Sequence, residues 1–76
     1  MIRIILHDNL IDEHKHLESE SVIQHFSDIS VSEIIDALKI NYDILGLIVL
    51  NGLSVTPEAM VGDNSIVDFH PYAEGG

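Results

Sequence analysis

The C-terminal pair Gly75-Gly76 is the part of this sequence whose residue types could do chemistry. Glycines can thread a narrow channel, adopt backbone angles closed to other residues and leave a terminal carboxylate sterically open. Small residues are also common in frayed chain ends, so the pair alone does not decide its role. The elements that precede the pair must show whether the chain presents this carboxylate to a partner.

The composition is that of one small acidic domain. The chain has 76 residues, of which 46% are hydrophobic, and this length supports one core. The formal net charge of -10 repels nucleic acids and anionic lipids, so we expect no nucleic-acid partner. The charge either steers the domain toward a basic protein surface or serves solubility alone. The chain has no cysteine, so no side-chain thiol can carry sulfur.

The apolar segments are too short for a membrane span. The longest runs from Ile44 to Leu53, is interrupted by two glycines and an asparagine, and is shorter than the roughly 18 residues of a membrane helix. The first eight residues show neither a signal-peptide core nor a cleavage site. We therefore expect a soluble cytoplasmic protein with no membrane partner.

Hydrophobic periodicity predicts the element order β-β-α-β-β-β. The predicted strands cover residues 2–7, 17–26, 47–50, 53–55 and 65–70. Both faces of strand 2–7 are at least partly apolar, which suits an interior strand, and we expect it to form a hairpin with strand 17–26. The continuous apolar run 47–50 is typical of a strand covered on both faces.

The helix has the clearest local signals. Ser30 and Glu33 form an S-x-x-E capping box that starts it, and Asn41 is expected to end it. Its apolar positions have the spacing of one stripe that covers a sheet. They are Val31, Ile34, Ile35 and Leu38.

Three short segments read as connections. Asn51-Gly52 is a strong tight-turn signal, because both residues tolerate positive φ. Gly62-Asp63-Asn64 predicts another turn, and Thr56-Pro57-Glu58 predicts a single helical turn.

One helix covers one face of a sheet, so the opposite face must be solvated or bound to something. Apolar residues on that face would mark an interface, unless loops bury them. The candidates are Ile5, Ile48 or Leu50, and Ile66.

The chain changes character after His70. Proline cannot donate a ladder hydrogen bond, so Pro71 is expected to release residues 71–76 from the sheet. A domain of residues 1–70 would then carry a tail that reaches roughly 20 Å.

The L-N-G turn at Leu50 to Gly52, the Gly62-Asp63 turn, the last strand ending in Phe69, and Pro71 before Gly75-Gly76 resemble the ubiquitin-like sulfur carriers of the ThiS and MoaD families. The resemblance covers essentially the whole chain. It implies an α+β β-grasp roll, with a mixed sheet of four to five strands and one helix packed across one face.

The resemblance also implies a function. An E1-like adenylating enzyme of the MoeB/ThiF type would adenylate the Gly76 carboxylate, and a sulfur donor would convert it to a thiocarboxylate for an acceptor synthase. Gly75 would thread the active site. ATP and magnesium would belong to the activating partner, and this chain would bind no cofactor. It would be a carrier or the small subunit of a synthase in molybdopterin- or thiamine-type biosynthesis, and not itself an enzyme.

The expected partner contacts come from the last strand and the tail. They are Ile66, Phe69, Pro71, Tyr72 and Glu74. Glu74 departs from the family's usual small residue before Gly-Gly.

Two other functions would give the tail a different role, and two histidines raise the question of a metal site. Gly76 could instead join the chain to lysines of target proteins, as in a ubiquitin-like modifier, or the tail could be inert in a plain interaction module. His14 and His16 would project on one side of an extended segment, but spacing fixes no third ligand, so we expect no metal site.

Overall fold

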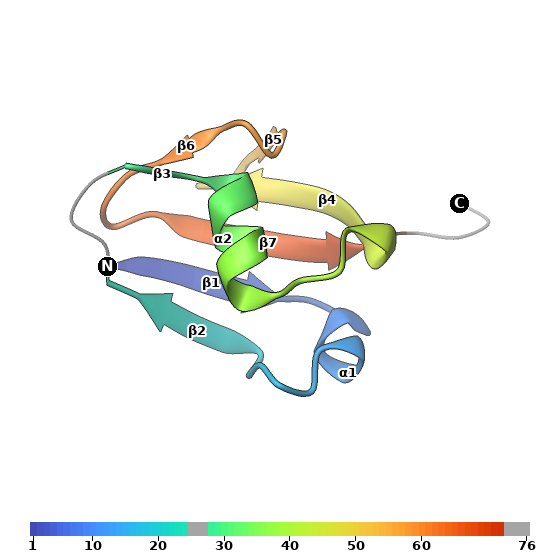
Figure 1. Cartoon of the computed structure of the whole chain (residues 1–76). Helices are drawn as coiled ribbons and strands as arrows, with labels where there is room; N and C mark the ends of the chain where they lie inside the picture. The colour runs from blue at the N-terminus through green and yellow to red at the C-terminus, as the bar shows by residue number, and fades with distance from the viewer. Residues whose placement is uncertain (25–27, 73–76) are drawn as a thin grey trace.

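The computed structural model describes residues 1–24 and 28–72, which form two sheets, the larger of which is covered on one face by a helix (Figure 1). The strands are β1 (Ile2–Leu6), β2 (Glu20–Ile23), β3 (Ile29–Ser30), β4 (Leu45–Leu50), β5 (Leu53–Val55), β6 (Met60–Val61) and β7 (Ile66–Pro71). The helices are α1 (Leu10–Glu13), α2 (Val31–Leu38) and the 3-10 helix η1 (Tyr42–Ile44). Within these ranges, no helix has the length and apolarity needed to cross a membrane.

The main sheet has five strands in the order β2-β1-β7-β4-β5. The central pair, β1 and β7, is parallel, and the other neighbours are antiparallel. Strands β3 and β6 form a separate antiparallel pair, and α2 lies across one face of the main sheet (Figure 1). The predicted mixed sheet with one helix on one face is therefore confirmed, as is the interior position of β1.

The core lies between α2 and the main sheet. The predicted stripe of the helix is confirmed, because Val31, Ile34 and Ile35 are fully buried and Leu38 packs against the core. Alternate residues of the two central strands face this stripe, as the period of a strand requires. They are Ile2, Ile4, Leu6, Val67 and Phe69.

The capping box of α2 is present, but the helix ends earlier than predicted. The Ser30 hydroxyl accepts a hydrogen bond from the Glu33 amide, and the Glu33 carboxylate accepts one from the Ser30 amide. The helix ends at Leu38, because Lys39 adopts the left-handed conformation with φ of 57°. Asn41 has a different role: its side-chain oxygen accepts a hydrogen bond from the Asp43 amide and so caps η1.

Several local predictions are corrected by the structure. The second strand spans only Glu20–Ile23, and its predicted end at Phe26 lies outside the described residues. The segment from Thr56 to Glu58 forms a β-turn, closed by the Ala59 amide donating to the Thr56 carbonyl at 3.0 Å, so the predicted helical turn is wrong. The short elements α1, η1, β3 and β6 were not predicted.

Strand β4 is covered on one face only. Ile48 and Leu50 point toward α2, whereas Leu47 is 43% exposed on the opposite face. The continuous apolar run therefore does not mean that both faces are buried here. The predicted Asn51-Gly52 turn after it is confirmed by φ values of 50° and 87°.

His14 ties α1 to the segment that follows α2. Its ring is buried, with Nδ1 2.9 Å from the Leu10 carbonyl oxygen and Nε2 2.9 Å from the Asn41 amide nitrogen. Because the Asn41 amide donates to Nε2, the ring proton lies on Nδ1 and is donated to Leu10. Both ring nitrogens are therefore engaged in the fold.

We expect Ile35→Asp to unfold the domain. An unpaired buried carboxylate costs several kcal/mol, whereas small domains have a total stability of about 5–15 kcal/mol. Circular dichroism during thermal unfolding measures the effect. The matched control is Ala37→Asp, which adds the same charge at an exposed position of the same helix; equal melting curves for the two variants would contradict the assigned stripe.

We expect His14→Ala to lower the free energy of unfolding by about 2–4 kcal/mol, because it leaves a cavity and two unsatisfied backbone groups. His16 is exposed and makes one ring hydrogen bond, to the Leu38 carbonyl, so His16→Ala should cost less than about 1 kcal/mol. Urea unfolding of both variants tests the difference, and similar losses would show that the buried ring is not a structural tie.

Candidate functional site

The last described residues, Pro71 and Tyr72, lie at the end of β7 in the middle of the sheet (Figure 1). We call this place the chain exit. Pro71 is still part of β7 and lies opposite Leu45. The Tyr72 amide donates a hydrogen bond to the Ile44 carbonyl at 2.8 Å. The prediction that Pro71 releases the chain is therefore wrong, because the backbone is held through Tyr72.

The direction of the backbone explains why proline is tolerated in a central strand. Amide groups alternate between the two edges of a strand, so the nitrogen of Pro71 points away from β4. On that side β1 has already ended at Leu6, and no ladder hydrogen bond is lost.

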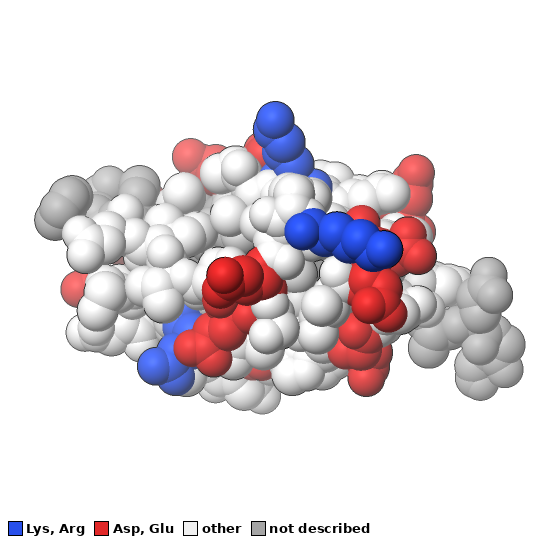
Figure 2. All heavy atoms as spheres, turned by 90° about the horizontal axis from the view of Figure 1, so that it is seen from below, with Lys and Arg blue, Asp and Glu red and all other residues white. Residues whose placement is uncertain are grey.

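A hollow of about 430 Å³ lies beside the place where β7 ends. Its lining residues come from α1 with its N-cap, from η1, and from the end of β7 with the residue after it, and they are Asn9, Glu13, Asp43, Ile44, Pro71 and Tyr72. Acidic side chains gather at this end of the molecule (Figure 2). The surroundings of the chain exit are therefore negatively charged.

The face of the sheet opposite α2 is partly apolar, and we call it the open face. It consists of the outward residues of β1, β2, β4 and β7, which are Arg3, Ile5, Val22, Leu47, Val49, Ile66, Asp68 and His70. Val22 is 55% exposed and Ile66 39%. Such a surface can accept apolar side chains of another protein.

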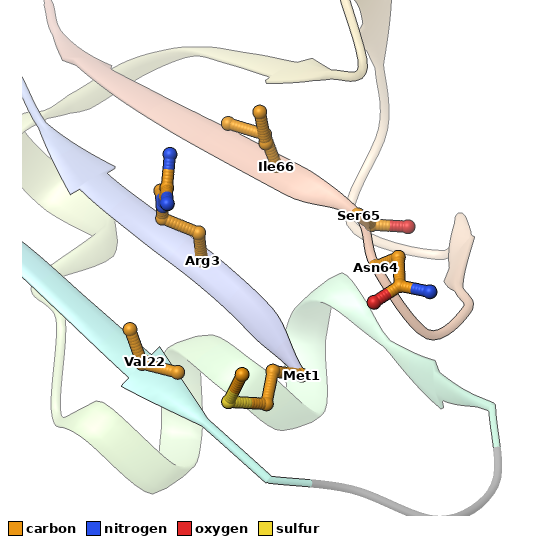
Figure 3. Close-up of a pocket in the computed structure, with 6 residues that line it drawn as sticks. All are labelled: Met1, Arg3, Val22, Asn64, Ser65 and Ile66. Carbon is orange, nitrogen blue, oxygen red and sulfur yellow. The ribbon is translucent and has the colours of Figure 1, made fainter.

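A second hollow, of about 250 Å³, lies at the end of the open face away from the tail. Figure 3 shows Arg3 on the central of three neighbouring strands, between Val22 and Ile66. The Arg3 guanidinium lies 3.2 Å from the Glu20 carboxylate, and the two form an exposed ion pair.

Two histidines and a carboxylate form a polar group between the open face and the tail. The His7 and His70 rings stack with centroids 4.2 Å apart and an angle of 6° between their planes. His7 Nε2 lies 2.7 Å from an Asp68 carboxylate oxygen. These contacts join Asp68 and His70 of β7 to His7, the residue that follows β1.

The structure places the residues predicted to contact a partner in different parts of the molecule. Ile66 lies on the open face, and Pro71 and Tyr72 lie at the chain exit. Phe69 is fully buried under α2, so it cannot touch a partner, because β7 alternates between the two faces. Residues Glu74, Gly75 and Gly76 lie outside the described residues.

The candidates for the open face divide in the same way. Ile5 and Ile66 lie there, whereas Ile48 and Leu50 face the core. The register with β7 decides the orientation, because Ile48 lies opposite Phe69. Ile66 is 39% exposed, so loops do not bury this part of the face.

The metal hypothesis for His14 and His16 has no geometric support. Both ring nitrogens of His14 are hydrogen-bonded to backbone groups. Among residues 1–24 and 28–72, no three histidine, aspartate or glutamate side chains are arranged to hold a metal ion.

A hydrogen bond with the N-terminal ammonium of Met1, which lines the hollow at the end of the open face, lowers the pKa of the Asp63 carboxyl. The other shifted groups lie near η1 and the Thr56 turn. Burial raises the pKa of the Tyr42 phenol, and the carboxylates of Asp36 and Glu58 raise it further. A hydrogen bond from the Thr56 side chain lowers the pKa of Glu58. Tyr42 therefore stays a neutral hydroxyl at neutral pH, close to the residue that holds the Tyr72 amide.

Sequence reasoning missed Gly46, which lies opposite the chain exit. A glycine inside a strand pattern indicates a bulge or a close approach of another backbone, so its position in the apolar run was an available signal. The acidic hollow could not be foreseen, because its residues come from three separate segments.

Comparison with known proteins identifies the fold. No model of a known protein family matches the chain, and no curated protein matches it. The crystal structure of SAMP1 from Haloferax volcanii superposes with a TM-score of 0.75 at 16% identity, covering 99% of this chain and 98% of that one. A putative molybdopterin converting factor, subunit 1, from Pyrococcus furiosus superposes with a TM-score of 0.73 at 14% identity, covering 95% and 97%. The chain therefore has the β-grasp fold that its sequence predicts.

Proposed function

We propose that this protein is a sulfur carrier whose Gly76 carboxylate is activated by an E1-like enzyme. The observation that carries the proposal is the full-length fold likeness to a putative molybdopterin converting factor subunit, in a chain that ends in Gly75-Gly76. The backbone is held in the sheet up to Tyr72, four residues before Gly76, which suits presentation of the end to a partner.

The proposed chemistry replaces one oxygen of the carboxylate by sulfur. The carboxylate attacks the α-phosphate of ATP in the partner and releases pyrophosphate, which leaves an acyl-adenylate with AMP as a good leaving group. A persulfide sulfur then attacks the acyl carbon and expels AMP. A second thiol forms a disulfide with the donor, and the thiocarboxylate remains on Gly76.

Catalytic groups come from the partner in this proposal. The chain contains no cysteine, and the residues that line the hollow at the exit include the carboxylates of Glu13 and Asp43 but no lysine or arginine, so they supply neither a sulfur nucleophile nor an anion-stabilising cation. The protein acts as a co-substrate whose contribution is correct positioning.

The open face is the proposed docking surface for the activating enzyme. It offers apolar side chains next to the strand that ends in the tail, so a bound partner lies beside the chain exit. The net charge of -10 favours a partner with a basic rim, since complementary charge raises the association rate and rejects wrong partners.

We expect Gly75→Val and Gly76→Val to abolish adenylation and Glu74→Ala to retain it. A β-branched side chain restricts the backbone and adds width where the partner's channel closes, while Glu74 lies outside that constriction. Intact mass after incubation with the E1-like enzyme, ATP and a sulfur donor measures the product, which is heavier by the difference between sulfur and oxygen.

Deletion of Gly76 is the companion variant, and it should stop pyrophosphate release with an unchanged melting temperature. Mass gain by the valine variants, or activation of the truncated chain, would refute the proposed chemistry. Conjugates to target lysines without a thiocarboxylate would instead favour a protein modifier.

We expect Ile66→Asp to raise the KM of the carrier in the adenylation reaction at least tenfold, because it places a charge in the apolar part of the docking surface. Leu53→Asp is the matched control. It adds the same charge to the same sheet at a residue that is 71% exposed and lies on the helix side. Equal KM values for the two variants would show that the open face is not used.

A further inference from the structure

The start of β4 contains an irregularity next to the chain exit. Leu45 lies opposite Pro71, but Leu47 lies opposite His70, so Gly46 is an extra residue on β4. This arrangement is a β-bulge, which bends a strand and changes its local twist. The bend occurs where β7 gives way to the C-terminal segment.

Gly46 touches the backbone of the departing chain. A Cβ atom on Gly46 would lie 2.7 Å from the Pro71 carbonyl oxygen and 2.7 Å from the Tyr72 Cα. These distances are far below van der Waals contact, and both neighbours are backbone atoms that cannot rotate away. Any side chain at position 46 must therefore displace the Pro71-Tyr72 backbone.

The same backbone is also held by one hydrogen bond to the segment before β4. The Tyr72 amide donates to the Ile44 carbonyl at 2.8 Å, two residues before Gly46. Ile44 belongs to η1, which Asn41 caps, so the acceptor is fixed by its own local structure. Gly46 and Ile44 together hold Pro71 and Tyr72 in one path.

We propose that Gly46 is a positioning residue for the proposed carboxylate activation, with the bulge setting the direction in which the chain leaves the sheet. This inference rests on the proposed function, because it concerns the same reaction. Gly76 is the fourth residue after Tyr72, so the two are at most about 14 Å apart along the chain. A partner docked on the open face therefore receives the carboxylate only if the exit points toward its active site.

The expected effect is on the rate of the bound complex and not on binding. Gly46 is not one of the open-face residues, so a substitution there changes no side chain of the proposed docking surface. A displaced exit misplaces the carboxylate, and a misplacement of about 1 Å can reduce a rate 100-fold. A fold-stabilising role alone would not separate the two kinetic parameters.

The test compares Gly46→Ala with Gly62→Ala. A Cβ on Gly62 would meet only an Asp28 carboxylate oxygen at 3.6 Å, an ordinary contact, so this control makes the same substitution without the clash. Pyrophosphate release with the E1-like enzyme gives kcat and the KM of the carrier. We expect Gly46→Ala to lower kcat at least tenfold with less than a threefold change in KM, and Gly62→Ala to match the native protein.

A second pair of variants isolates the hydrogen bond if Gly46→Ala does not fold. Tyr72→Pro removes the amide that donates to Ile44, and Tyr72→Ala keeps it while removing the same side chain. We expect Tyr72→Pro to have a kcat at least tenfold below that of Tyr72→Ala. Hydrogen exchange of the Tyr72 amide should be at least tenfold faster in Gly46→Ala than in Gly62→Ala.

The outcomes separate this inference from the proposed function. If the native protein is activated and Gly46→Ala has the same kcat as Gly62→Ala, the positioning role is refuted while the carrier function stands. If the native protein releases no pyrophosphate, the carrier function fails and the reaction role of Gly46 fails with it. If the hydrogen-exchange rate of the Tyr72 amide is the same in Gly46→Ala and Gly62→Ala, Gly46 does not help to hold the Pro71-Tyr72 backbone, whatever the activity.

Discussion

The parallel pairing of β1 with β7 determines where the other elements can lie. It joins the first and last strands in the centre of the sheet, with Ile4 opposite Val67 and Leu6 opposite Phe69, and these residues form two adjacent apolar rows under α2. Strand β2 and the β4–β5 hairpin are then added at the two sides. Because β1 and β7 run in the same direction, α1 and the chain exit lie at the same end of the molecule (Figure 1).

The short helix α2 covers only one face of the main sheet because the chain is small. A domain of about this length buries only about 60% of the surface that its unfolded chain exposes, so a second apolar layer is not available. The open face nevertheless keeps apolar residues such as Leu47 and Ile66 next to polar ones. Exposed apolar side chains do not stabilise the isolated domain, and their grouping beside the strand that ends in the tail is consistent with a surface that a partner covers.

Local signals predicted the parts of the fold that depend on neighbouring residues, and long-range contacts decided the rest. The capping box of α2, its apolar stripe and the Asn51-Gly52 turn are set within a few residues, and all three are present. The behaviour of Pro71 depends on where β1 stops, more than sixty residues earlier in the chain. The orientation of Phe69 follows from strand alternation, but the sequence does not state which side α2 covers. The exit of the tail was therefore the least predictable part of the candidate site.

A held exit is physically useful for a chain end that must enter another protein. Ordering one residue of backbone costs about 1–2 kcal/mol, so fixing two residues in advance removes about 2–4 kcal/mol from what a partner must supply. Pro71 contributes through its restricted φ, and Tyr72 through the hydrogen bond to Ile44. Gly46 makes this arrangement possible, because only a residue without a side chain allows the two backbones to approach so closely. The bulge thus fixes the path of the backbone up to Tyr72, the last described residue before the carboxylate that reacts in the proposed function.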